Sequence, residues 1–309
     1  MSAANEAQPP PHALLRPQIA IPFLIVALIW GSTWFVILGQ NDGAPAGWSV
    51  TYRFLIATPA MFAVAVAMRR PLRLGAKGHW LSALVGVTQF CGNYNFVYRA
   101  EAYLTSGIVA VMVGLLLVPN TLLGRVLLGQ VITRRFAIGS TIAIAGIAML
   151  LLHEARMAPL GGNVLLGVAL ALGGMLSASI SNVVQANETG RSLPMVSLLA
   201  WAMLYGTLAD AALAWIMSGP PVFPASGAYW AGTTYLAIAG SVVTFPLYYT
   251  LIRQLGAGRA AYNGVAVIVI AMLISTAFEG YRWSVLAIAG AGLAMVGLVI
   301  ALRARRPVA

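Results

Sequence analysis

Residues 129–146 read GQVITRRFAIGSTIAIAG, and residues 280–297, which lie 151 positions later, read GYRWSVLAIAGAGLAMVG. Under this shift glycines coincide at four places, which are Gly107 with Gly258, Gly129 with Gly280, Gly139 with Gly290, and Gly146 with Gly297. Four matches in a chain of 32 glycines could partly be chance, but their order is shared: a helix start, an inter-helix turn and two close-packing positions. This order favours a duplication, so we predict that the chain consists of two similar halves.

The composition indicates that lipid is the solvent of this chain. Of its 309 residues, 60% are hydrophobic and only 8% are charged, and the mean hydropathy is +0.87. An average soluble domain carries about 25% charged residues. Because unpaired backbone groups are not tolerated in hydrocarbon, such a chain crosses it as helices or as a closed barrel. The apolar runs are roughly 18 to 25 residues long, which selects helices.

Ten apolar runs are each long enough to cross a hydrocarbon core of about 30 Å. They cover residues 19–39, 48–68, 79–98, 105–124, 135–152, 162–185, 195–217, 228–252, 260–278 and 284–302. We therefore predict an all-α integral membrane protein with ten transmembrane helices. The predicted parts are a disordered cytoplasmic tail at 1–18, a first five-helix repeat at 19–152, a second at 162–302 and a basic cytoplasmic tail at 303–309.

A net charge of +11 would indicate nucleic-acid binding in a soluble protein, so the location of the positive charges decides. If the N-terminus is cytoplasmic, 14 of the 18 Lys and Arg residues fall on the cytoplasmic side, three fall outside, and Arg53 lies within the second span. This bias follows the positive-inside rule. We expect a multi-pass protein of the bacterial inner membrane, with both termini cytoplasmic and no nucleic-acid partner.

The repeat is expected to be inverted because five is an odd number. A second unit of five helices enters the membrane upside down relative to the first, so their pseudo-two-fold axis lies in the membrane plane. The charges agree: the loop between the fourth and fifth helices carries Arg125, Arg134 and Arg135 inside, whereas its counterpart carries Glu279 and Arg282 outside. Inverted repeats are typical of secondary transporters.

Several short motifs, in this order along the chain, resemble a known family. The stretches WGSTW at 30–34 and RFLIA at 53–57, together with segments 129–146 and 278–297, are similar to the EamA-type transporters of the drug/metabolite transporter superfamily. The resemblance covers nearly the whole chain from residue 20 to 302. Each motif is weak by itself, and their order across ten helices carries the specificity. Within the superfamily the chain most resembles the YddG-like aromatic amino acid exporters.

This resemblance implies two inverted five-helix repeats, a central cavity built largely from helices 1 to 4 and 6 to 9, and peripheral helices 5 and 10. It also implies solute export, with amino acids as a common cargo. The chain departs from the family at two places. Gln130 stands where relatives usually have Glu, and the ninth helix lacks a common proline, since Val265 to Ile270 is unbroken, although the fourth helix keeps Pro119.

The sequence contains no motif that would indicate an enzyme. It has no GxxxxGK[ST] loop for a nucleotide, and its three histidines do not combine with Cys, Asp or Glu at metal-ligand spacing. Paired aspartates or a Ser/His arrangement for hydrolysis within the membrane are absent too. The single cysteine, Cys91, cannot form an intramolecular disulfide. We predict a protein that is not an enzyme and that uses no cofactor or metal.

Polar and aromatic side chains recur at helical spacing within the predicted spans. The candidate solute-binding residues are Gln89, Asn93, Tyr94, Tyr98, Gln185, Trp201, Tyr205, Thr244 and Tyr248. An amide or hydroxyl at mid-membrane needs a partner, which is either another helix or a watery cavity with solute in it. The alternative is structural, because Ser and Thr often bond to their own backbone and Tyr or Trp often fills an apolar gap. The 151-residue shift pairs Asn93 with Thr244, so the third and eighth helices are expected to face each other around the solute.

Two charged residues fall within the predicted spans. Asp210 is the acidic one and is the candidate for coupling to an ion gradient, with helix packing or an interfacial position as the alternative. The resemblance implies a comparison with the small multidrug relatives of the superfamily, which use a Glu in the first helix; because the first helix has no carboxylate here, facilitated transport or exchange is favoured over obligatory proton antiport. Arg53 either recognises a carboxylate or snorkels to the outer interface.

A neutral cavity of amides, hydroxyls and aromatic rings suits a small zwitterion better than a polyanion, which would favour several buried Lys or Arg. We expect a secondary transporter that exports small metabolites, above all amino acids, with aromatic ones among them, by alternating access. The alternatives are export of another neutral metabolite or drug-like solute, and a non-transporting receptor or scaffold, which would need no inverted repeat. The expected partners are the solute and the lipid bilayer; a monomer is expected, with a homodimer as the alternative.

Overall fold

The computed structural model describes residues 16–129, 131–157, 163–185, 187–255 and 262–302. Within these ranges the regular secondary structure is entirely helical, as the all-α prediction requires. The predicted tails at 1–18 and 303–309 lie outside the described residues, except for residues 16–18. There the first helix begins at Pro17, two residues before the predicted start.

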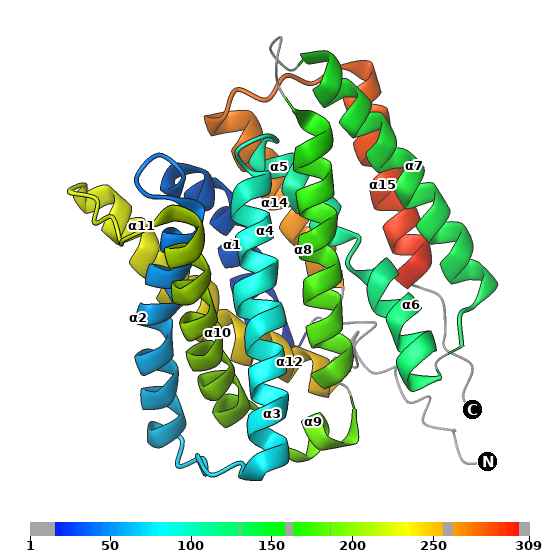
Figure 1. Ribbon diagram of the computed structural model, residues 1–309. Coiled ribbons are helices and arrows are strands. Elements are labelled where there is room, and N and C mark those ends of the chain that lie inside the picture. Colours follow the sequence, from blue (N-terminus) through cyan, green and yellow to red (C-terminus); the bar gives the residue numbers. More distant parts are fainter. Residues whose placement is uncertain (1–15, 130, 158–162, 186, 256–261, 303–309) are drawn as a thin grey trace, which may run out of the picture.

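The helices of the first half follow the first five predicted runs. They are α1 (Pro17–Gln40), α2 (Ala46–Ala67), α3 (Gly75–Val85), η2 (Gly86–Asn93), α4 (Tyr94–Ala100), α5 (Ser106–Gly114), α6 (Leu117–Leu128) and α7 (Arg134–Met157). The third run is one helical column made of α3, η2 and α4, and the fourth run consists of α5 followed by α6 (Figure 1).

The second half repeats this layout. Its helices are α8 (Val164–Gln185), α9 (Glu188–Ser192), α10 (Met195–Ser218), α11 (Gly227–Ala237), η3 (Ile238–Val243), α12 (Thr244–Leu255), α14 (Tyr262–Phe278) and α15 (Val285–Leu302). The short α9 lies in the connection between α8 and α10, and α11, η3 and α12 form one column that corresponds to the eighth run.

Seven helical stretches among the described residues are long and apolar enough to cross a membrane, with α5–α6 and α11–η3–α12 each counted as one, and two shorter apolar helices cover residues 263–278 and 285–301. The column of α3, η2 and α4 is in neither group. Its π-helical part carries Gln89 and Asn93, which lower its hydropathy. The described residues therefore contain several candidate membrane spans, whereas the count of ten stays a prediction.

Both columns contain a π-helix at the same place in the repeat. In the first half it covers Gly86–Asn93 and in the second half Ile238–Val243, so the two starts differ by 152 residues, close to the shift of 151 in the sequence. A π-helical turn widens the helix and is frequent at functional sites. Pro246 follows η3 and cannot donate to the Val242 carbonyl, which helps to disrupt the α-helical ladder there.

The fourth and ninth helices differ, as expected from the presence of a proline in the fourth helix alone. Pro119 cannot donate a backbone hydrogen bond to the Leu115 carbonyl, and the helix is interrupted at Leu115 and Leu116 between α5 and α6. The corresponding helix α14 has no proline and continues from Tyr262 to Phe278.

Close contact between α7 and α15 shows how the halves are related. A Cβ atom added to Gly139 would lie 2.6 Å from the Gly297 carbonyl oxygen, and one added to Gly146 would lie 2.6 Å from the Gly290 carbonyl oxygen. The helices therefore run antiparallel. Since Gly139 aligns with Gly290 and Gly146 with Gly297, exchanging the halves turns each contact into the other. This reciprocity is what a two-fold axis across the helix pair produces (Figure 1).

The two aligned turn glycines have the same backbone conformation. Gly129 ends α6 at φ 65°, and Gly280 follows α14 at φ 68°. This left-handed conformation favours glycine because it has no Cβ atom. The shared conformation supports the alignment of the halves.

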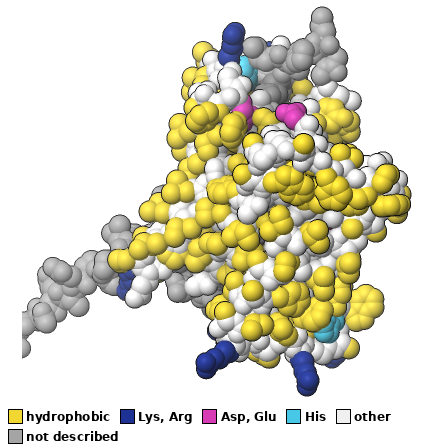
Figure 2. All heavy atoms as spheres, turned by 90° about the vertical axis from the view of Figure 1, so that its left-hand side faces the viewer, with side chains coloured by type: hydrophobic (Ala, Val, Ile, Leu, Met, Phe, Trp, Pro, Cys, Tyr) yellow, Lys and Arg dark blue, Asp and Glu magenta, His cyan; other side chains and the backbone are white. Residues whose placement is uncertain are grey.

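The surface separates apolar and charged side chains. Figure 2 shows hydrophobic side chains over the middle of one face, while most of the charged ones gather toward its two ends. This distribution fits a bilayer around the middle. We name the ends after the predicted topology: the outer end carries connections 41–45, 101–105 and 219–226, and the inner end carries connection 68–74 and α9.

Candidate solute-binding site

A buried arginine lies where α2, α4 and η3 meet. Arg53 of α2 is 1% exposed and donates to Ser241 Oγ from Nε at 3.2 Å and from Nη2 at 3.1 Å. Nη2 also donates to the Gly240 carbonyl and to the Tyr94 hydroxyl, both at 3.4 Å, and Nη1 donates to the Tyr98 hydroxyl at 3.5 Å. We call these five residues the Arg53 cluster.

The helix position of Arg53 explains why it is not at the interface. It lies seven residues after the start of α2 at Ala46, which is about 10 Å from the outer end of the helix at 1.5 Å per residue. The side chain stays at this depth and points between neighbouring helices. Arg53 is therefore buried and does not snorkel to the outer interface, whereas its other predicted role, recognition of a carboxylate, stays a prediction.

Aromatic rings enclose the Arg53 cluster. The Tyr94 ring centroid is 4.3 Å from the guanidinium carbon, a distance at which a cation is attracted to the ring face. Phe90 of η2 packs against Phe245 of α12 with their ring centroids 5.4 Å apart, and Trp30 of α1 lies 5.7 Å from Phe245. Of these rings, Tyr94 contacts the guanidinium directly, as does Phe54 of α2 with its centroid 5.5 Å from the guanidinium carbon, and Phe245 brings a ring of the second half against Phe90 and Trp30.

The π-helix η3 provides the acceptor at the centre of this arrangement. The Gly240 carbonyl oxygen accepts from Trp30 Nε1 at 3.3 Å, from Arg53 Nη2 at 3.4 Å and from Thr244 Oγ1 at 2.8 Å. A Cβ atom at position 240 would lie 3.0 Å from Thr33 Cγ2 and 3.3 Å from Arg53 Nη2, so the close approach of these side chains favours glycine. The widened turn therefore holds three side chains on one carbonyl.

The polar residues predicted on the third helix divide between two neighbours. Gln89 Nε2 donates to Asn93 Oδ1 at 3.3 Å, and Asn93 Nδ2 donates to the Gly174 carbonyl of α8 at 2.9 Å. Tyr94 and Tyr98, by contrast, reach the Arg53 cluster next to η3. The tyrosines thus face the column of α11, η3 and α12. The two amides instead bond toward α8, which is the sixth predicted helix.

The predicted residues Thr244 and Tyr248 belong to α12, which lies beside α1. Tyr248 has its ring centroid 4.9 Å from that of Trp30. Thr244 is fully buried and donates to the Gly240 carbonyl of its own column. Together with Tyr94 and Tyr98 they form the group of predicted residues that lies in or next to the Arg53 cluster.

The remaining predicted residues lie in two other places. At the inner end, Trp201 Nε1 donates to the Leu72 carbonyl at 2.9 Å, and the Tyr205 hydroxyl lies 3.0 Å from His79 Nδ1. On α8, Gln185 Nε2 donates to Ser181 Oγ at 3.1 Å. The structure therefore does not bring all nine predicted side chains together.

Asp210 is buried between α10 and α4. Asn95 Nδ2 donates to Asp210 Oδ1 at 2.6 Å, and Arg99 Nη1 donates to Asn95 Oδ1 at 3.0 Å. Asp210 is 0% exposed. The hydrogen bond between Asp210 and Asn95 joins the outer half of α10 to α4. Among the described residues, no three His, Cys, Asp or Glu side chains are arranged to hold a metal ion.

A cavity of about 650 Å³ lies at the outer end and is called the outer vestibule below. It is lined by residues 41–46 and by Tyr98, Arg99, Ala102, Tyr103, Leu166 and Leu170. Tyr98 therefore belongs both to the wall of the outer vestibule and, through its hydroxyl, to the Arg53 cluster. The volume lies within the range of small-molecule sites.

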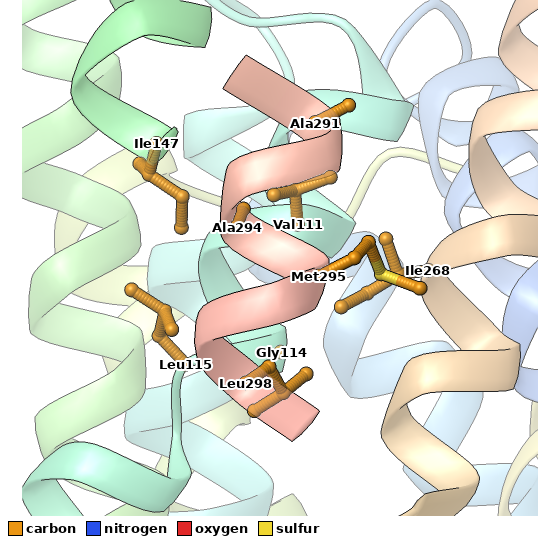
Figure 3. A pocket seen from close by; sticks show the side chains of 9 residues that line it. All are labelled: Val111, Gly114, Leu115, Ile147, Ile268, Ala291, Ala294, Met295 and Leu298. Atoms are coloured by element: carbon orange, nitrogen blue, oxygen red, sulfur yellow. The ribbon is translucent and has the colours of Figure 1, made fainter. Parts of the chain in front are cut away.

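A second void lies away from this region and is too small for a solute. Its volume is about 20 Å³, room for about one water molecule, and its lining is apolar. Figure 3 shows Val111, Ile147, Ile268 and Leu298 around it, from α5, α7, α14 and α15. It is a packing gap where the α7–α15 pair joins the rest of the molecule.

Two glutamates lie at the outer end beyond the spans. Glu279 accepts hydrogen bonds from the backbone N–H of Ser106, at 3.0 Å, and from the Ser106 hydroxyl. Glu101 is 2% exposed. Burial, with a further contribution from the negative charge of Glu279, raises the pKa of Glu101 well above its ordinary value of 4.5.

Comparison with known proteins now identifies the family. A model of the EamA-like transporter family matches residues 18–152 and again residues 165–303. The chain belongs to the EamA-like transporter family. It is therefore a multi-pass membrane protein of a transporter family with two repeats, and not a member of an enzyme family.

Individual relatives are distant. Over 285 residues the chain is 22% identical to Protein PagO of Salmonella typhimurium (strain LT2), which covers 92% of this chain and 91% of that protein. A protein of known crystal structure is 17% identical, covers 93% of this chain and 99% of its own, and superposes with a TM-score of 0.67. At this identity the second likeness shows the fold alone.

Three residues of the site, Ser241, Phe90 and Phe245, were not among the nine candidates. Ser241 does share a helical face with the candidates Thr244 and Tyr248, so the sequence contained a signal for it. Ser241 could have been found by treating Arg53 as buried and asking which hydroxyls lie near it. No sequence signal marks the two phenylalanines, because apolar rings are common in every membrane helix.

Proposed function

We propose that this chain is a secondary transporter that exports small metabolites, above all amino acids with aromatic ones among them, by alternating access across a bacterial inner membrane. The observation that carries this proposal is the position of the Arg53 cluster. Arg53, Tyr94 and Tyr98 come from the first repeat, and Gly240 and Ser241 come from the second. Inverted-repeat transporters bind solute at this junction, because motion of one repeat against the other exposes it to each side in turn.

The surroundings of the cluster support a small amphipathic cargo. Tyr94, Phe90, Phe245 and Trp30 provide rings, and hydroxyl and carbonyl groups provide polar contacts. A polyanion would favour several cations, whereas this cluster contains one. An amino acid with an apolar or aromatic side chain meets these conditions.

Of the predicted binding residues, four are proposed to touch the solute in the state shown by the structure or in one close to it. They are Tyr94, Tyr98, Thr244 and Tyr248, which lie in or beside the Arg53 cluster. Gln89, Asn93, Gln185, Trp201 and Tyr205 form hydrogen bonds away from the Arg53 cluster, Gln89 and Gln185 within their own helices. We propose that these five contact the solute along its path, as their bonds change during the transport cycle.

Exchange or facilitated flux is the proposed mode of transport, and both termini are proposed to be cytoplasmic. Asp210 remains the coupling candidate, but its carboxylate is bonded to Asn95 at 2.6 Å, so a proton-linked step must first break this contact. The matched test is Asp210→Asn, which keeps the shape and removes the charge. Facilitated exchange that continues in this variant, with the pH profile of the wild type, would exclude Asp210 from coupling.

Counterflow in proteoliposomes tests the proposal. Purified protein is reconstituted with one unlabelled amino acid inside at high concentration, and uptake of the same labelled amino acid is followed without nucleotide. A panel of amino acids and other small metabolites then ranks the cargo. We expect transient accumulation with at least one amino acid and none in protein-free liposomes. Strict dependence on ATP, or no accumulation of any amino acid, would contradict the proposed function.

A further inference from the structure

We infer that Arg53 binds the carboxylate of the transported solute, and that the cargo class is small organic acids with a single carboxylate, amino acids included. This inference rests on the proposed function and names the chemical group that the Arg53 cluster holds. It concerns recognition only. Direction of flux and coupling do not enter it.

The first support is a buried positive charge without an anionic partner. Each hydrogen-bond acceptor of Arg53 among the described residues is neutral: three hydroxyl groups, from Ser241, Tyr94 and Tyr98, and the Gly240 carbonyl. Removing a cation from water costs several kcal/mol unless an anion compensates for it. Ionisable groups inside a membrane are therefore rare, and they mark substrate or ion sites.

The second support is the length of these hydrogen bonds. They measure 3.1 to 3.5 Å. Charge-assisted N–H to carboxylate bonds are about 2.7 to 2.9 Å long and roughly twice as strong as neutral ones. The guanidinium is thus satisfied weakly, and a carboxylate would replace these acceptors with a gain in free energy.

The third support is where the two tyrosine hydroxyls lie on the guanidinium. Tyr98 is on Nη1 and Tyr94 is on Nη2, at 3.5 and 3.4 Å. These two nitrogens form the end of the planar fork that holds a carboxylate by two parallel hydrogen bonds. Ser241 lies on the other edge, at Nε and Nη2, and keeps the fork oriented. The hydroxyls therefore occupy the positions that two carboxylate oxygens would take.

The fourth support is the location of Tyr98. This residue lines the outer vestibule of about 650 Å³, and its hydroxyl contacts Arg53. Tyr98 is fully buried and separates Arg53 from the outer vestibule, so a shift of this one side chain away from Nη1 would free one of the two fork positions next to a space large enough for a small molecule. The aromatic rings of Tyr94 and Phe54, which lie beside the guanidinium, are then next to the rest of the solute.

A purely structural role is the competing explanation, since Arg53 also links α2, α4 and η3. The two roles differ in what they recognise. A structural Arg53 affects folding and leaves the choice between solutes unchanged. A carboxylate-binding Arg53 distinguishes an acid from its amide, which has nearly the same shape.

The experiment measures ligand-induced thermal stabilisation of purified protein, so it does not depend on transport. The probes are L-phenylalanine and L-leucine, their carboxamides, and the corresponding amines without the carboxylate. We expect the wild type to bind the acids roughly 10- to 150-fold more tightly than the amides and amines, on the scale of a hydrogen bond to a charged group. Equal binding of acid and amide by the wild type would overturn the inference.

Three variants complete the test. Arg53→Gln should lose the preference for the acid, whereas Arg53→Lys should keep a reduced preference because the charge remains. Thr58→Val is the matched control on the same helix: it removes a buried hydrogen bond to Thr207 Oγ1 of 3.1 Å and should retain the full preference. An Arg53→Gln protein that still prefers the acid would overturn the inference. If that variant does not fold, an Arg53→Lys protein with unchanged acid affinity would overturn it, because the ammonium cannot form the bidentate contact.

The same panel in the counterflow assay separates this inference from the proposed function. Acid-selective binding that needs Arg53, in a protein that transports no amino acid, would leave the inference standing and contradict the function. Amino-acid transport in which acid and amide compete equally would contradict the inference and leave the proposed function standing.

Discussion

Replacing Gly146 by alanine should destabilise the contact between α7 and α15. The added Cβ atom would lie 2.3 Å from the Ala294 backbone nitrogen and 2.6 Å from the Gly290 carbonyl oxygen. Both are backbone atoms, so no side-chain rotation can relieve the overlap. The helices must move apart by about 1 Å to reach van der Waals distance, and the packing on both sides loosens.

The expected cost follows from two opposing effects. Overpacking of a tight interface costs about 1–3 kcal/mol, while alanine gains about 0.5–1 kcal/mol over glycine in the middle of a helix. The free energy of unfolding should therefore fall by about 0–2.5 kcal/mol, and relative to a glycine-to-alanine change at an unpacked helix position by about 1–3 kcal/mol. By the two-fold symmetry, Gly297→Ala should behave in the same way, because a Cβ atom there would lie 2.2 Å from the Ala143 backbone nitrogen and 2.6 Å from the Gly139 carbonyl oxygen.

The assay is unfolding of purified protein by titration from mild detergent into dodecyl sulfate, followed by tryptophan fluorescence. Gly292→Ala is the matched control, because Gly292 lies in α15 and a Cβ atom there would meet no atom within 4 Å. It should be neutral or slightly stabilising. The packing argument fails if Gly146→Ala is as stable as Gly292→Ala.

The remaining predictions concern charge, topology and the site. Because the folded protein holds the Glu101 proton above the ordinary pKa of 4.5, stability should fall as pH rises from there through the raised pKa; Glu101→Gln should flatten this fall, whereas a change at the exposed Asp42 should not. An unchanged pH profile in Glu101→Gln would refute the assignment. In a cysteine-free background, Ala225→Cys should react with an impermeant thiol reagent added to intact cells and Ala76→Cys should not; both positions are exposed, and the reverse pattern would invert the topology. Tyr248→Ala should weaken solute binding about 5- to 150-fold; a loss of thermal stability with unchanged affinity would show that the ring only packs.

Much of the helical architecture was accessible from hydropathy and glycine positions. A backbone in lipid must satisfy its own hydrogen bonds, so each long apolar run has one structural solution, the helix. The aligned Gly129 and Gly280 likewise adopt the same left-handed turn, because a residue without Cβ fits there most easily. The less apolar column of α3, η2 and α4 shows the limit of this reasoning, since the residues that lower its hydropathy also bond to neighbouring helices.

The site was predictable in part. Tyr94 and Tyr98 were identified from their spacing of four, and they lie together on Arg53. Gln89 and Asn93 have the same spacing, yet Asn93 bonds to the Gly174 carbonyl of α8 instead of turning toward η3. Spacing places side chains on a common face of a helix, but it does not say which neighbour that face meets.

The sequence by itself therefore determined that the chain is helical, that it lies in a membrane, that its halves are related and which family it resembles. These properties depend on composition, on local backbone hydrogen bonding and on residues that recur at a fixed shift. Only the tertiary structure decided that Arg53 is buried instead of snorkelling, that the π-helices lie at matching positions, and that Ser241 and Gly240 hold the guanidinium. The reason is physical: these contacts join residues up to 188 positions apart, and a π-helical turn changes the direction of the side chains that follow it, which no local pattern encodes.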